Sequence, residues 1–184
     1  MFSEQDLGMF IRALRFATDK HQNQKRKGRD RLPYVNHLIH VTDLLWHVGD
    51  VRDLPTLLGA LLHDTLEDTD TTPDEIEAVF GAKILSIVQE VTDDKTLPKA
   101  RRKQLQIEHA PHISDEAKQI KLADKIDNIH DISHDPPEGW SHERQVAYLD
   151  WGEAVVAGLR GVNAALEARF DAVLHEGRER MGAG

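Results

Sequence analysis

Residues 54–68 (LPTLLGALLHDTLED) constrain the fold most, because an almost wholly apolar segment ends in four ionisable side chains. Asp53 can cap a helix here, and Pro55 is tolerated in a first turn, where its missing N–H has no partner. A helix that is apolar nearly all round is typical of the centre of a domain. We therefore expect a buried central helix over 54–68.

Helical signals continue along the rest of the chain. Capping residues or glycines precede apolar residues at helical spacing, and no stretch alternates with period two. We expect helices after Ser3, Tyr34, Asp53, Thr72, Gly81 and Ser114, another over 101–109, and a long stretch from Ser141 to Phe170 bent by Gly152, Gly158 and Gly161. The prediction is an all-α, multi-helix fold in a single domain over 1–184, with its core at about 4–175 and an end that frays after Gly177.

Composition excludes several kinds of site. The 184 residues contain no cysteine, which rules out disulfides, thiolate metal sites and a cysteine nucleophile. A net charge of −9 argues against broad nucleic-acid binding. The start, MFSEQDLGMF, does not resemble a signal peptide, and no apolar run approaches the roughly 20 residues that cross a bilayer. We expect a soluble, cytoplasmic protein without nucleic-acid or membrane partners, and the oligomeric state stays open.

Charge is unevenly distributed along the chain. Residues 20–31 hold six Lys or Arg and one Asp, whereas residues 63–77 hold seven Asp or Glu and no Lys or Arg. If folding brings these segments together, a cation-binding centre would lie beside an anion-binding rim. The alternative is that each segment is a solvated surface, as charge runs usually are.

The sequence HDTLED at 63–68 points to a metal. On a helix His63 and Glu67 share one face, and Asp64 and Asp68 share another. The side chains of adjacent helical residues diverge by about 100 degrees, so His63 and Asp64 can bind one ion only where the helix ends or kinks. Charges beside so apolar a segment are costly unless they are paired or bind a metal. The alternative is a solvated helix C-terminus.

Two further places offer ligands. His37 follows the basic segment on the next expected helix, and Asp124 lies among apolar residues with Asn128 four positions on. Either residue alone would be typical of a satisfied core side chain. Together with His63 and Asp64 they make a mixed nitrogen and oxygen set, which suits manganese, iron or zinc better than calcium.

These residues carry a family resemblance. The order His37, His63-Asp64, Asp124 resembles the metal quartet of the HD-domain metal-dependent phosphohydrolases. The flanking segments PYVNHLIHV, ALLHDTLEDTDTT, FGAKI, VTDDKTLPKARRK and KLADKIDN are similar to the hydrolase domain of the RelA/SpoT family. PPEGWS and YLDW match its compact members, the small alarmone hydrolases that include the metazoan SpoT homologue. The resemblance covers about 20–160.

The resemblance implies hydrolysis of the 3′-pyrophosphate of (p)ppGpp to GDP or GTP plus pyrophosphate. It implies a metal, preferably Mn²⁺ with Fe or Zn as alternatives, on His37, His63, Asp64 and Asp124. Glu67 and Asp68 would orient and deprotonate the attacking water. The implied substrate contacts are Arg26, Lys27, Asn128, Lys99, Arg144 and Tyr148. Lys25, Arg29 and Arg31 are expected to be solvated flanks.

Two positions depart from the family pattern: Leu38 stands where proline is common, and His130 where arginine is common. The length also leaves no room for the synthetase domain of the long members, so we expect hydrolysis alone. Two alternatives stay open. The same site could act on another nucleotide, such as the 2′-phosphate of NADPH, or the chain could be a catalytically silent alarmone-binding module.

Overall fold

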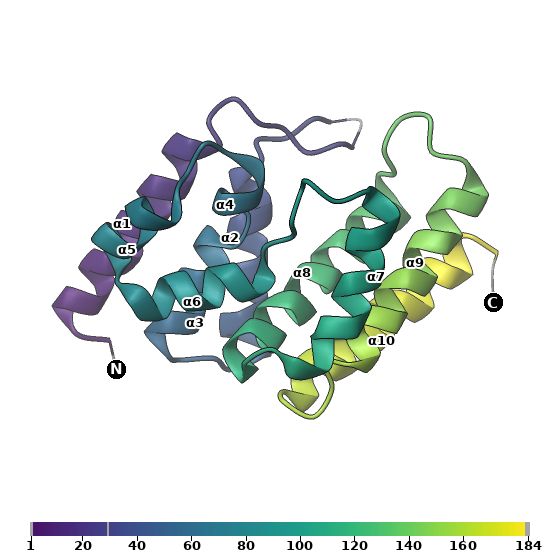
Figure 1. Cartoon of the computed structure of the whole chain (residues 1–184). Helices are drawn as coiled ribbons and strands as arrows, with labels where there is room; N and C mark the ends of the chain where they lie inside the picture. The colour runs from purple at the N-terminus through teal and green to yellow at the C-terminus, as the bar shows by residue number, and fades with distance from the viewer. Residues whose placement is uncertain (1, 29, 183–184) are drawn as a thin grey trace.

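A computed structural model describes residues 2–28 and 30–182, and this part of the chain is built from helices (Figure 1). The elements are α1 (Glu4–Lys20), α2 (Val35–Asp43), the π-helical turn η1 (Leu44–Val48), α3 (Leu54–Leu62), α4 (Thr65–Asp68), α5 (Pro73–Phe80), α6 (Ala82–Val91), α7 (Lys99–His109), the 3-10 turn η2 (Ala110–His112), α8 (Asp115–His134), α9 (His142–Ala157) and α10 (Ala164–Arg180). The described residues contain no strand beyond one isolated bridge between Lys25 and Pro33. The predicted all-α class is confirmed.

Capping side chains set five of the expected helix starts. Ser3 and Thr72 form capping boxes with Asp6 and Glu75, and Asp53 accepts from the N–H of Thr56. Ser114 and Ser141 cap α8 and α9 in the same way. Each cap satisfies an N–H group that lacks an intrahelical partner.

Helix α3 lies at the centre, as its apolar sequence predicts. Its residues 56–62 are all buried, and it packs against α1, α2, α6 and α8. Gly59 allows the closest approach, because a Cβ there would lie 2.8 Å from Ile87 of α6 and 2.9 Å from Ile120 of α8. Leu57 and Ala60 join a core cluster shared with α8, α9 and α10, whereas neighbouring leucines of α3 join a second cluster with α1, α5 and α6.

The single helix expected over 54–68 is interrupted. Helix α3 ends at Leu62, and α4 starts at Thr65. His63 Nδ1 lies 2.8 Å from the Ala60 carbonyl, and the Thr65 hydroxyl donates to the Leu62 carbonyl at 2.6 Å. These side chains therefore bind carbonyls of the last turn of α3 in competition with backbone N–H groups, which favours a break in the helix. The kink that a shared metal ion requires is present at His63 and Asp64.

The C-terminal stretch is also two helices and not one bent helix. Helix α9 ends at Ala157, and α10 starts after Asn163, whose side chain accepts from the N–H of Leu166. Gly161, with φ of 96°, lies in the connection and adopts a conformation that favours glycine. Helix α10 continues past Gly177 to Arg180. None of the described helices is both long and apolar enough to cross a membrane.

Candidate metal centre and active site

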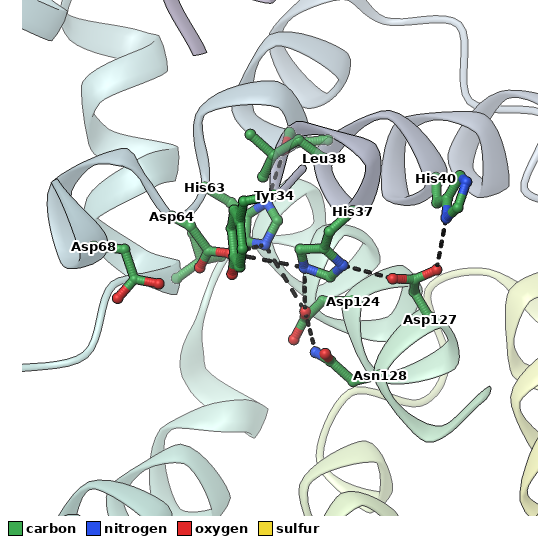
Figure 2. Close-up of polar contacts among 12 residues, drawn as sticks. Tyr34, His37, Leu38, His40, His63, Asp64, Asp68, Asp124, Asp127 and Asn128 are labelled. Carbon is green, nitrogen blue, oxygen red and sulfur yellow. Dashed lines mark hydrogen bonds and ion pairs between the residues drawn. The ribbon is translucent and has the colours of Figure 1, made fainter. Parts of the chain in front are cut away.

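Four predicted ligands meet where α2, the turn after α3, and α8 converge (Figure 2). His37 Nε2 lies 3.1 Å from Asp124 Oδ1, and ligand atoms of His37, His63 and Asp124 all fall within 4.8 Å of one another. Asp64 Oδ2 lies 3.0 Å from His63 Nε2 and 3.7 Å from His37 Nε2. The kinked turn thus lets adjacent residues His63 and Asp64 face one centre.

Both imidazoles present the same nitrogen to this centre. The Nδ1 atom of His37 lies 2.6 Å from Asp127 Oδ2, on the far side of the ring from Asp124 (Figure 2). The Nδ1 atom of His63 is held by the Ala60 carbonyl. A partner on Nδ1 fixes the ring and leaves Nε2 for a metal. His63 Nε2 is buried and has no hydrogen-bond partner among the described residues.

The electrostatics of the centre favour a bound cation. Burial opposes the charged form of His63, but the Asp64 and Asp124 carboxylates outweigh it and raise the pKa of His63 to about 9. Burial is likewise outweighed for Asp64, whose pKa is held well below its usual range by His63 and His37. A divalent metal would supply the positive charge that these carboxylates attract and would bind the unpartnered Nε2 atom. The residues present therefore fit a metal.

Glu67 and Asp68 lie on α4, directly after the ligands. Glu67 Oε2 accepts a hydrogen bond from the backbone N–H of Asp93 at 3.0 Å. Burial, reinforced by the nearby Asp93 and Asp64 carboxylates, raises the pKa of Glu67 to about 7. Asp68 instead pairs with Lys95 and accepts from Gln24 Nε2 at 3.2 Å. A carboxyl with a pKa near 7 suits proton transfer near neutral pH.

A cavity of about 180 Å³ opens from this centre and is lined by the ligands His63, Asp64 and Asp124 together with Glu67 and Asp68. A second cavity of about 190 Å³ adjoins it and is lined by Arg26 and Lys27. The two cavities share Tyr34, Asp68, Asn128 and Tyr148 in their walls. Four of the six predicted substrate contacts, Arg26, Lys27, Asn128 and Tyr148, therefore line this space.

Lys99 and Arg144 do not line either of these two cavities, but Lys99 lies close enough to Lys27 and Arg144 for their charges to interact. Partial burial and the positive charges of Arg144 and Lys27 lower the pKa of Lys99. Arg144 is exposed and stacks over the Trp140 ring, 4.1 Å from its centroid. Segments distant in sequence thus form one cationic rim beside the acidic centre.

Arg26 has partners already. Its Nη2 atom donates to Asp131 Oδ2 at 2.6 Å and to Asp127 Oδ2 at 3.2 Å. It also lies over the Tyr34 ring. The neighbouring Lys25 and Arg31 are exposed, but Lys25 also lines the second cavity with Arg26 and Lys27, and Arg29 lies outside the described residues.

Three side chains that contact the predicted metal ligands were not predicted from the sequence. Asp127 orients His37 and also lies 3.3 Å from Nδ1 of His40, a histidine to which the sequence assigned no role. Tyr34 donates to Asp64 Oδ2 at 2.6 Å. Lys125 is buried and donates to Asp124 Oδ2 at 2.8 Å. The only signal was their position inside the matched segments PYVNHLIHV and KLADKIDN.

The two departures from the family pattern lie away from the metal-binding atoms. Leu38 is fully buried in the cluster shared with α1, where its side chain packs among apolar neighbours. His130 is half-exposed and stacks on His134, with ring centroids 4.1 Å apart.

Comparisons with known proteins agree with this geometry. The HD domain family model matches residues 13–149. The chain is 51% identical over 166 residues to the Xenopus tropicalis protein named guanosine-3′,5′-bis(diphosphate) 3′-pyrophosphohydrolase MESH1, covering 90% of this chain and 93% of that one. It is 50% identical over 162 residues to the Homo sapiens protein of the same name, covering 88% and 90%.

A solved structure gives the same picture. It is described as a metazoan ortholog of SpoT that hydrolyses ppGpp, and it matches with a TM-score of 0.90 and 42% identity. The match covers 100% of this chain and 99% of that one. The chain therefore belongs to the HD-domain family and, within it, to the group of compact guanosine-3′,5′-bis(diphosphate) 3′-pyrophosphohydrolases named MESH1.

Proposed function

We propose that this protein hydrolyses the 3′-pyrophosphate of guanosine 3′,5′-bis(diphosphate) and its triphosphate analogue, yielding GDP or GTP plus pyrophosphate. One observation carries the proposal. Two histidine Nε2 atoms and two carboxylates converge beside Glu67, and the adjoining cavity brings the basic side chains of Arg26 and Lys27 next to them. Its close relatives, the MESH1 proteins, are named for this reaction.

His37, His63, Asp64 and Asp124 would hold the metal. When bound, a divalent metal supplies Lewis-acid polarisation of a phosphoryl oxygen and lowers the pKa of water. The family resemblance favours Mn²⁺, and this nitrogen and oxygen donor set also accommodates iron or zinc. The buried Nε2 atom of His63, which makes no hydrogen bond with the described residues and lies 3.0 Å from Asp64 Oδ2, supports a metal at this position.

The chain's own carboxylates handle the proton. Glu67 accepts a proton from the attacking water, and Asp68 orients that water with the help of Lys95. The water oxygen bonds to the phosphorus attached to the 3′ oxygen, and the bond from that phosphorus to the 3′ oxygen breaks. The 3′ oxygen leaves with GDP and takes up a proton, while pyrophosphate keeps the new oxygen.

Basic side chains in and around the adjoining cavity bind the anionic substrate. Arg26 and Lys27 supply positive charge in the adjoining cavity, with Lys99 and Arg144 at the rim. Burial raises the pKa of Tyr148 to about 12, so its hydroxyl stays protonated and can donate to an oxygen. Asn128, already bonded to Asp124, fixes the nucleotide beside the metal ligands.

The same proposal includes a cytoplasmic location and a small-molecule partner. With 32 acidic and 23 basic residues, the chain carries a net charge of −9, which disfavours nucleic acid.

Product analysis by ion-exchange chromatography tests the proposal. Metal-stripped protein is incubated with ppGpp, and separately with NADPH, each with and without Mn²⁺. We expect GDP and pyrophosphate from ppGpp only when Mn²⁺ is present. Phosphate released from NADPH, with ppGpp left intact, would overturn the substrate and keep the metal site. No turnover of either nucleotide would favour a binding role.

A further inference from the structure

We propose that Arg102 is a positioning residue, which holds the Glu67 carboxylate with one oxygen free to accept the proton of the attacking water. The inference rests on the proposed function of Glu67 as the base and adds a residue to which neither the sequence nor the family resemblance assigned a role.

The two oxygens of Glu67 have different surroundings. Oε2 accepts the hydrogen bond from the Asp93 N–H at 3.0 Å. Oε1 faces Arg102 Nη1 at 3.6 Å, which is close enough for charge attraction but too far for a hydrogen bond. Oε1 therefore keeps its capacity to accept a proton while a cation stabilises the carboxylate.

Among the described residues, Glu67 is the one acidic side chain that pairs with the charge of Arg102. Its side chain is only 24% exposed, and its Nε atom is buried without a hydrogen-bond partner among the described residues. A guanidinium that served the fold alone would be expected to make the hydrogen bonds that compensate for burial. Its one ion pair with a described residue is with Glu67.

Helix α7 supports Glu67 from two directions. Gln106 lies four residues after Arg102, on the same face of the helix. Its Nε2 atom donates to Asp93 Oδ2 at 2.7 Å and so fixes the residue whose N–H binds Glu67 Oε2. Arg102 and Gln106 thus constrain the two oxygens of one carboxylate.

Arg102 approaches Glu67 from outside the catalytic cavity. It lines a cavity of about 370 Å³ between α6, α7 and α8, which shares Gln106 and Lys121 with the cavity that holds the metal ligands, and Arg102 itself is not in the wall of that second cavity. Arg102 is therefore expected to act through Glu67 and not by contacting the nucleotide.

The neighbouring Arg101 provides a matched control. It lies on the same helix, is 50% exposed and pairs with Glu108 at 3.1 Å. With ppGpp and Mn²⁺, we expect Arg102→Gln to lower kcat at least about tenfold and leave KM within about twofold. Arg102→Lys should recover much of the rate because it keeps the charge, and Arg101→Gln should match the unmodified protein.

A double-mutant cycle tests whether Arg102 acts through Glu67. If Arg102 acts through Glu67, Arg102→Gln should have little further effect on single turnover in a Glu67→Gln background. A full-sized additional loss there would contradict the inference. A raised KM with unchanged kcat would make Arg102 a substrate contact and also overturn it.

A spectroscopic readout keeps this test separate from the proposed function. In metal-free protein, we expect the ¹³C resonance of the Glu67 carboxyl to shift in Arg102→Gln and to stay in place in Arg101→Gln. If the unmodified protein does not hydrolyse ppGpp, the proposed function fails, and this resonance still decides whether Arg102 acts on Glu67. An unchanged resonance in Arg102→Gln would refute the inference.

Discussion

At the scale of single residues, the environment of Glu67 makes turnover sensitive to pH. Burial raises the pKa of Glu67 from 4.5 to about 7, so below that pH the side chain is protonated and cannot accept a proton. Because a bound cation lowers the pKa of a nearby carboxyl, we expect kcat of the Mn²⁺-loaded protein to fall about tenfold per pH unit along an acid limb that lies above 4.5 and no higher than about 7. A kcat–pH profile between pH 5 and 9 measures this, and an acid limb near 4.5 would contradict it.

Asp127 is expected to control metal affinity through His37. Its Oδ2 atom lies 2.6 Å from His37 Nδ1, and such partners typically change metal affinity about 10–100-fold when they are replaced. We expect Asp127→Asn to weaken Mn²⁺ binding within that range, as measured by competition with a chromophoric chelator.

Asp131→Asn is the control for this change. It removes the other carboxylate that binds Arg26 and leaves His37 untouched, so metal affinity should be unchanged. An equal loss in both variants would show that Arg26 pairing, and not His37 orientation, sets the affinity.

The sequence predicted the residues that converge on the centre better than the residues that support them. Ligand types in unusual apolar contexts pointed to His63 and Asp124, and the structure places them together. Lys125 escaped notice because a lysine beside an aspartate normally lies in solvent. In the structure Lys125 is buried, and its Nζ atom lies 4.7 Å from the Trp151 ring centroid.

At the scale of elements, caps predicted where helices start, but helix ends were harder to predict. The break after Leu62 depends on the His63 and Thr65 side chains taking backbone carbonyls, an outcome that periodicity does not reveal. The connection before α10 depends on Gly161 and the Asn163 cap, and the apolar spacing of the sequence runs through both.

The close approach of α3 to α6 and α8 predicts opposite effects for two glycine substitutions. We expect Gly59→Ala to lower the free energy of unfolding by about 1–3 kcal/mol, because its Cβ would overlap Ile87 and Ile120. Gly8→Ala on α1, with nothing within 4 Å, should raise it by about 0.5–1 kcal/mol. Urea denaturation measures both, and an equal effect would contradict the tight packing at Gly59.

At the scale of the whole molecule, the fold brings together two charge patterns that are separate in the sequence. The loop after α1 and the loop between α8 and α9 lie at the same edge of the molecule (Figure 1). Their residues Lys27 and Trp140 line one cavity next to the acidic centre. The net charge of −9 hides the basic side chains Lys25, Arg26 and Lys27, which lie beside the acidic centre only in the folded chain.

The central claim is that Asp64 binds the metal whereas Glu67 accepts the proton of the attacking water. Measuring bound metal and turnover in variants of both residues tests this claim most directly. Bound Mn²⁺ would be counted by plasma mass spectrometry in Asp64→Ala and Glu67→Ala, with ppGpp turnover measured on the same preparations. We expect Asp64→Ala to lose metal and turnover together, whereas Glu67→Ala keeps one ion per chain and loses turnover. Loss of the metal from Glu67→Ala, or its retention in Asp64→Ala, would contradict this assignment of roles.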